Sequence, residues 1–105
     1  ETVLVQRLIT AASEGNLGEI KALEERISLD ATDYDMRTAL HLAAADGHIL
    51  VVTYLLEKGV KAYPKDRWGN TPYHEASQKS VGCNGGGKQK QYQTICEMLE
   101  KEKEK

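Results

Sequence analysis

The feature that most constrains this chain is an internal repeat of 33 residues. The stretch DYDMRTALHLAAADGHILVVTYLLEKG starts at Asp33, and the stretch DRWGNTPYHEAS starts at Asp66. The pairs that match at this one offset are Asp33 and Asp66, Thr38 and Thr71, His41 and His74, and Ala43 and Ala76. A chain with such a period builds one small structural unit per repeat and buries its core by stacking the units.

A third copy precedes these two, in LITAASEGNLGEIKALEE. The pairs that match at an offset of 32 are Leu8 and Leu40, Ala11 and Ala43, Gly15 and Gly47, Ile20 and Val52, and Leu23 and Leu55. The 105 residues are enough for one small domain. The sequence therefore predicts a single domain over 1–105, with repeats at about 1–32, 33–65 and 66–105.

Each repeat is expected to form two helices. The apolar residues at helical spacing are Leu40, Ala43 and Ala44 for a first helix and Val51, Val52, Leu55 and Leu56 for a second. Thr38 and Thr71 stand where an N-cap is needed, and Pro72 suits a first helical turn. Gly47 and Gly59 are suited to end the two helices.

The stretch TALHLAA at 38–44 resembles the T-x-L-H-x-A-A signature of ankyrin repeats. The resemblance implies an all-α solenoid of about three helix-turn-helix repeats with short hairpin-like loops. It also implies that His41 and His74 are structural, hydrogen-bonding near the preceding Thr and toward a neighbouring repeat. No Cys or carboxylate cluster accompanies either histidine, so we expect no metal and no cofactor.

Two longer stretches, DYDMRTALHLAAADGHILVVTYLLE (33–57) and YPKDRWGNTPYHEA (63–76), resemble the C-terminal ankyrin region of animal glutaminases. This resemblance covers about residues 8–78. Similar stretches occur in some plant kinases and asparaginase-type amidohydrolases, which remain alternative parents. A glutaminase hydrolyses L-glutamine to L-glutamate and ammonia, with Ser, Lys and Tyr in a separate β-lactamase-like domain.

No S-x-x-K motif occurs in this chain, which begins at Glu1 rather than Met. We therefore expect an excised, non-catalytic interaction or assembly module. The parent is expected to be intracellular, and mitochondrial if it is a glutaminase.

The stretch GCNGGGKQ (82–89) is close to a phosphate-binding loop, which makes nucleotide binding by Gly82–Lys88 a remote alternative. The closing Ser or Thr is missing, and a polar helical stretch precedes the loop instead of a buried strand. We instead expect a mobile Gly-rich insertion at about 79–91 with an accessible Cys83. Aligning Ile95 with Val52, an offset of 43, places the helix that follows.

Because ankyrin arrays bind through their hairpin tips and the concave face of their first helices, the resemblance also implies candidate partner-binding residues. They are Tyr34, Asp35, Met36, Arg37, Arg67, Trp68 and Asn70 at the tips, and Leu42, Asp46 and Glu75 on the first helices. Two alternatives are that Trp68 packs flat on the neighbouring hairpin and that Arg67 pairs with Asp33 or Asp35.

The expected partner is another protein or a second copy of the chain. A net charge of −2 gives no electrostatic case for nucleic acid or a membrane surface. For self-association, the apolar residues of ETVLVQRLI could either cap the array or pair with a second copy; they are Val3, Val5, Leu8 and Ile9.

Overall fold

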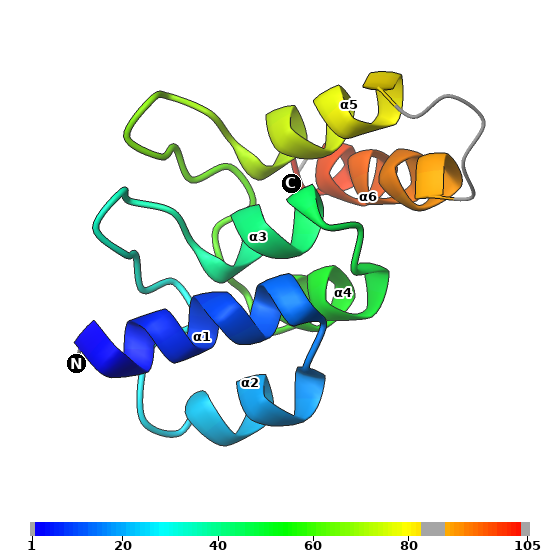
Figure 1. Cartoon of the computed structure of the whole chain (residues 1–105). Coiled ribbons are helices and arrows are strands. Elements are labelled where there is room, and N and C mark those ends of the chain that lie inside the picture. The colour runs from blue at the N-terminus through cyan, green and yellow to red at the C-terminus, as the bar shows by residue number, and fades with distance from the viewer. Residues whose placement is uncertain (1, 83–87, 104–105) are drawn as a thin grey trace.

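The structure is a computed structural model that describes residues 2–82 and 88–103, and it contains three antiparallel helix pairs stacked in a row (Figure 1). The pairs are α1 (Thr2–Glu14) with α2 (Leu17–Leu23), α3 (Ala39–Ala45) with α4 (Ile49–Glu57), and α5 (Pro72–Gly82) with α6 (Lys88–Lys103). The described residues form no strand. The prediction of an all-α repeat stack is confirmed.

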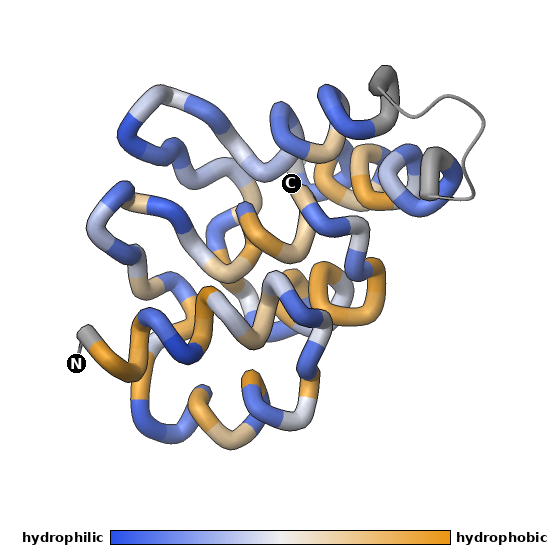
Figure 2. The backbone as a smooth tube through the Cα atoms, in the orientation of Figure 1, coloured by the Kyte–Doolittle hydropathy of each residue, from blue (hydrophilic) through white to orange (hydrophobic). Residues whose placement is uncertain are grey.

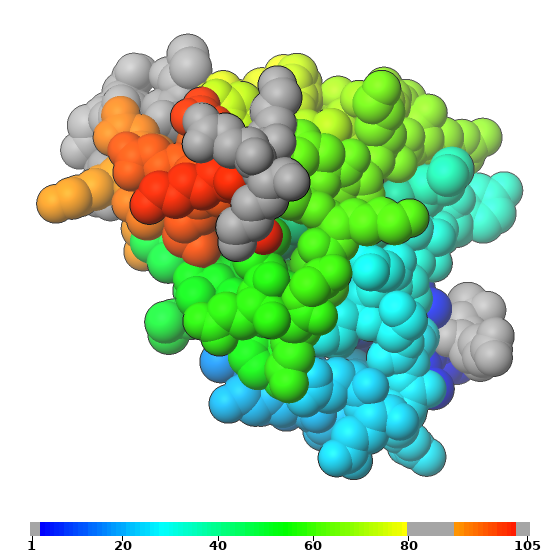
Figure 3. Space-filling view, turned by 180° about the vertical axis from the view of Figure 1, so that it is seen from behind, coloured from blue at the N-terminus to red at the C-terminus, as the bar shows by residue number. Residues whose placement is uncertain are grey.

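The first helices pack side by side in the order α1, α3, α5, and α4 packs against α6. Seen from behind in Figure 3, the second helices follow one another in the same order, α2 in blue and cyan, α4 in green and α6 in orange and red. Among the described residues, the main contacts between repeats thus join neighbouring repeats, as expected for a solenoid. Within the described residues, no helix has the length and apolar character needed to cross a membrane.

The core follows the predicted helical stripes. Alanines of the first helices, among them Ala11, Ala43 and Ala76, are almost fully buried between neighbouring helices. Their small side chains let the helices approach closely. Larger residues of the second helices, such as Val52 and Leu55, are also fully buried. Figure 2 shows hydrophobic segments along α3 and α4 in the middle of the stack.

The third repeat is longer than the second, chiefly because its helices are longer. α5 continues to Gly82 and α6 already begins at Lys88, so much of the expected 79–91 insertion is helical. That part of the expectation was wrong, because the polar residues on both sides of the glycines can continue their helices. The predictions of a mobile loop and an accessible Cys83 lie outside the described residues.

The turn between the two helices of a repeat is closed by a contact to the previous repeat. His48 Nε2 donates to the carbonyl oxygen of Ser13 at 2.7 Å. In the third repeat the Tyr92 hydroxyl donates to the carbonyl oxygen of Ala45 at 3.1 Å. These carbonyls belong to the last turns of α1 and α3, where no helical N–H remains to satisfy them. Two different side chains therefore perform one capping task.

This equivalence corrects the alignment of the last helix. Tyr92 follows His48 by 44 residues. Leu99 follows Leu55 by the same interval, and both leucines are fully buried. Ile95 therefore takes the place of Val51 rather than Val52, and the predicted offset of 43 was one residue short.

Candidate functional site

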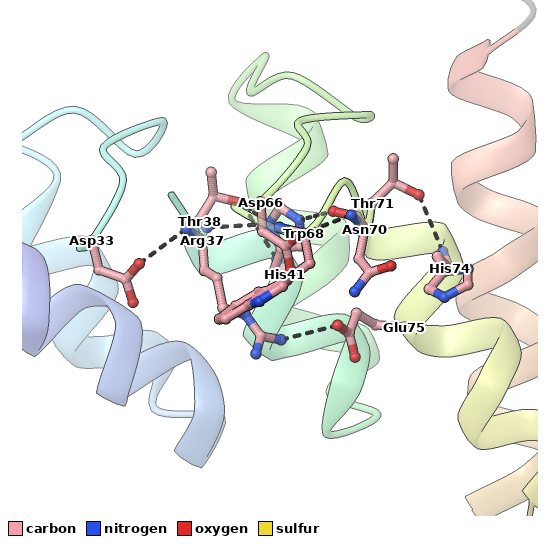
Figure 4. Close-up of polar contacts among 10 residues, drawn as sticks. All are labelled: Asp33, Arg37, Thr38, His41, Asp66, Trp68, Asn70, Thr71, His74 and Glu75. Carbon is pink, nitrogen blue, oxygen red and sulfur yellow. Dashed lines mark hydrogen bonds and ion pairs between the residues drawn. The ribbon is translucent and has the colours of Figure 1, made fainter. Parts of the chain in front are cut away.

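Two loops with the same internal hydrogen bonds project from the stack. In the first, Asp33 Oδ1 accepts from the backbone N–H groups of Asp35 and Arg37, at 2.9 and 3.0 Å. In the second, Asp66 Oδ1 accepts from the residues two and four positions later, at 2.9 and 2.8 Å (Figure 4). An aspartate that bonds its own backbone in this way holds a turn in one conformation. The repeat in the sequence is therefore also a repeat in loop geometry.

His41 ties the second repeat to the third. Its Nδ1 accepts from the Thr38 N–H at 3.1 Å, and its Nε2 donates to the carbonyl oxygen of Asn70 at 2.8 Å (Figure 4). Thr38 is the N-cap of α3. The imidazole is fully buried, and this desolvation lowers the pKa of His41 below its ordinary value. The ring is thus a neutral hydrogen-bonding bridge, which is a structural arrangement.

His74 stands at the same position of the third repeat, but its surroundings differ. Its backbone N–H donates to the hydroxyl of Thr71 at 3.2 Å, which repeats the capping contact before Pro72. Its side chain is exposed, because the described part of the chain has no fourth repeat to cover it. No group of His, Cys, Asp and Glu in the described residues is arranged to hold a metal ion.

Several candidates are occupied by contacts between repeats. The Arg37 guanidinium lies 3.3 Å from the Glu75 carboxylate of the next repeat. Asp46 accepts a hydrogen bond of 2.6 Å from the Ser13 hydroxyl of the previous repeat. Leu42 is half-buried. Arg37, Glu75 and Asp46 thus join neighbouring repeats, so the structure does not bring these candidates together as a free surface.

Five other candidates form what we call the tip surface: Tyr34, Asp35, Met36, Arg67 and Trp68. Tyr34, Trp68 and Met36 have 90%, 62% and 54% of their surface exposed. Trp68 therefore keeps more than half of its surface exposed, and its packing flat on the neighbouring hairpin stays an alternative.

Arg67 joins the two loops of the tip surface. Its guanidinium lies 3.7 Å from the Asp35 carboxylate and 5.8 Å from the centre of the Tyr34 ring. Its backbone N–H donates to the Asp35 carbonyl oxygen at 2.8 Å. The pairing of Arg67 with Asp35 was one of the two alternatives expected for this arginine. The two tips are thus held next to each other by the chain's own contacts.

Two features of the site were missed by the sequence reasoning. Met36 has a positive φ of 63°. Aligning it with Gly69, 33 residues later, could have indicated this. The role of Tyr92 at the α3 carbonyl had no sequence signal, because the corresponding residue of the second repeat is a histidine.

Comparison with known proteins gives related sequences of several kinds. The liver isoform of mitochondrial glutaminase from Rattus norvegicus is 43% identical over 76 residues, which is 70% of this chain and 13% of the relative. Serine/threonine-protein kinase 12 from Arabidopsis thaliana is 45% identical over 71 residues, 67% of this chain and 16% of the relative. An L-asparaginase from Dirofilaria immitis is 43% identical over 67 residues, 63% of this chain and 11% of the relative.

The chain thus matches less than a fifth of each of these relatives, and what they share with it is the repeat region. The sequence profile described as ankyrin repeats in three copies matches residues 8–104. That match, the three stacked helix pairs and the two equivalent loops lead to one conclusion: this chain belongs to the ankyrin-repeat family.

Proposed function

We propose that the chain is a non-catalytic protein-binding module and that its main contact surface is the tip surface. The observation that carries the proposal is the exposure of Tyr34, Met36 and Trp68 on loops whose backbone is already fixed. Tyr, Trp, Met and Arg are the residue types enriched at protein interfaces. A surface that is ordered before binding loses less conformational entropy when a partner binds.

The concave residues Leu42, Asp46 and Glu75 contribute less in this proposal, because they are partly covered by contacts within the array. The partner is another protein or a second copy of this chain. For the second case, Val3 is 71% exposed at the α1 end of the stack, whereas Leu8 and Ile9 are buried and unavailable. A mass that rises with concentration in sedimentation equilibrium would identify self-association.

Binding can be tested by selecting peptides from a display library against the folded domain. The double substitution Tyr34→Ala/Trp68→Ala removes two exposed anchors, and we expect selected peptides to lose about 30-fold or more in affinity. Leu50→Ser is the matched control, because Leu50 is 75% exposed but lies on α4 outside the tip surface. Peptides that bind the double variant and the wild type equally well would refute the tip surface as the binding site.

We further propose that the module belongs to a longer protein of the glutaminase kind, located in mitochondria. The support is the similarity to the rat glutaminase and the small fraction of that protein which the chain matches. A protein kinase or an asparaginase parent is the alternative, because relatives with those names share the repeat region at similar identity.

The parent can be identified from the complete reading frame. A β-lactamase-like domain with a Ser-x-x-Lys motif, together with glutamine hydrolysis by the complete protein, is the expected result. A kinase or asparaginase domain in its place would overturn this part of the proposal and leave the binding role intact.

A further inference from the structure

Met36 has a backbone conformation that its side chain disfavours. Among the described residues it is the one non-glycine with positive φ, at 63°. Gly69 holds the same place in the second loop, with φ of 81°. In both loops the N–H at this position donates to the carbonyl oxygen of the aspartate three residues earlier, at 3.0 Å. The two turns therefore differ at this position mainly in the side chain.

A side chain in the left-handed region is sterically disfavoured, and Gly69 shows that the same turn forms without one. The turn therefore does not explain the methionine. Met36 is 54% exposed and belongs to the tip surface. The side chain that Met36 adds at this position is therefore free to act at the surface.

The second methionine of the chain, Met98, provides an internal comparison. It lies on α6, is partly buried and packs against the core. Its Sδ lies 3.9 Å from the Thr53 hydroxyl, which donates to it. Met36 is therefore the more exposed of the two methionines.

We propose that Met36 is a site of reversible oxidation by peroxide. One oxygen atom of hydrogen peroxide is transferred to Sδ, the O–O bond breaks, an S–O bond forms, and water leaves. A methionine sulfoxide reductase reverses the reaction. Two thiols supply the electrons and become a disulfide, and the sulfoxide oxygen leaves as water.

The effect of Met36 oxidation on partner binding rests on the function proposed above. Oxidation replaces an apolar, polarisable side chain by a polar one, which disrupts contacts made by methionine at interfaces. Met36 makes no part of the buried core, so the fold remains while the tip surface changes. Peroxide thus weakens partner binding at a folded module.

The chemical step is tested on the whole chain without any partner. The protein is treated with dilute hydrogen peroxide, and sulfoxide at each methionine is followed by peptide mass spectrometry. We expect Met36 to react at least about tenfold faster than Met98 in the folded protein, and at about the same rate in concentrated guanidinium chloride. Equal rates in the folded protein, or a faster Met98, would overturn the proposal.

Reversal and the effect on binding are measured in a Met98→Leu background, where Met36 is the remaining methionine. A mixture of the two epimer-specific sulfoxide reductases with dithiothreitol should restore the original mass, and persistent sulfoxide would refute reversibility. A peptide selected on the reduced domain should bind about tenfold more weakly after oxidation and recover after reduction. Met36→Leu is the control whose binding peroxide should leave unchanged.

The outcomes separate the two proposals. Unchanged binding after oxidation overturns the switch and leaves the binding function standing. If no selected peptide depends on the tip surface, the binding function fails and the switch fails with it, whereas the oxidation site itself is decided by mass spectrometry alone.

Discussion

At the scale of single residues, the same amino acid takes different roles in different repeats. His41 and His74 both follow a capping threonine by three residues, yet His41 is buried and His74 is exposed. The difference arises because the third repeat covers the second, whereas no described repeat covers the third. A histidine in this family pattern becomes a bridge only when the next loop offers it a carbonyl group.

The buried histidine predicts a pH dependence of stability. Because burial lowers the pKa of His41, the unfolded chain binds more protons than the folded chain below the ordinary value of 6.5. Stability is therefore complete above that pH and is lost as the pH falls toward the lowered pKa. Urea unfolding at a series of pH values should show the midpoint falling in this window.

A substitution separates His41 from the other titrating groups. His41→Gln should cost about 2 kcal/mol at pH 7 through lost buried hydrogen bonds, and it should flatten the pH dependence. His74→Gln, at the equivalent exposed position, should keep the wild-type slope. Identical slopes for His41→Gln and the wild type would show that His41 does not cause the effect.

Met36 predicts a stabilising substitution. Met36→Gly should raise the free energy of unfolding by about 1 kcal/mol, because glycine adopts positive φ without steric cost. Met36→Ala removes the same side chain beyond Cβ but keeps the strain, so it should change stability little. Thermal unfolding of both variants provides the measurement, and a destabilised Met36→Gly would contradict the strain argument.

At the scale of the elements, helix ends are determined both by local conformation and by neighbours. Gly15 and Gly59 each follow a helix with positive φ, at 74° and 83°. A Cβ on Gly59 would meet no atom within 4 Å, whereas a Cβ on Gly15 would lie 2.8 Å from His48 Nδ1. The histidine ring cannot move away freely, because its other nitrogen is bonded to Ser13.

This contrast gives a matched pair of substitutions. Gly59→Ala should cost about 1 kcal/mol, from backbone strain alone. Gly15→Ala should cost about 2–4 kcal/mol, because the added methyl group also disturbs the contact between the first two repeats. Denaturant unfolding measures both values, and equal costs would mean that the His48 contact adds nothing.

At the scale of the whole molecule, the repeats depend on one another. α3 lies between α1 and α5, and its alanines are buried on both sides. If the third repeat is removed, the second repeat therefore loses part of its buried apolar contacts and the hydrogen bond from His41 to the third repeat. Stacked repeats of this size need about three copies for independent stability.

A truncation tests this dependence. The fragment 1–65 retains the first two repeats, α1 to α4. We expect it to lose most of its helical circular dichroism and its cooperative thermal transition, because the exposed face of α3 is apolar. A fragment that kept a sharp transition would show that two repeats are sufficient here.

Much of the architecture was accessible from the order of residues. The period of 33, the capping threonines and the apolar stripes predicted the all-α stack, because each depends on local spacing. The helix bounds around the glycines at 79–91 and the register of α6 were predicted less well. The helix bounds and the register both depend on how far a polar helix continues while it packs against its neighbour. The helix propensity of the residues alone does not decide this.

By itself, the sequence determined that short helix pairs repeat and stack, since only stacking can bury their apolar faces. The tertiary structure decided which candidates remain free for a partner. Arg37, Asp46 and Glu75 are occupied by contacts between repeats, whereas Tyr34, Met36 and Trp68 stand exposed. The physical reason is that the exposure and the ion pairing of a side chain depend on residues about one repeat away. The residues next to it in the sequence do not indicate these contacts.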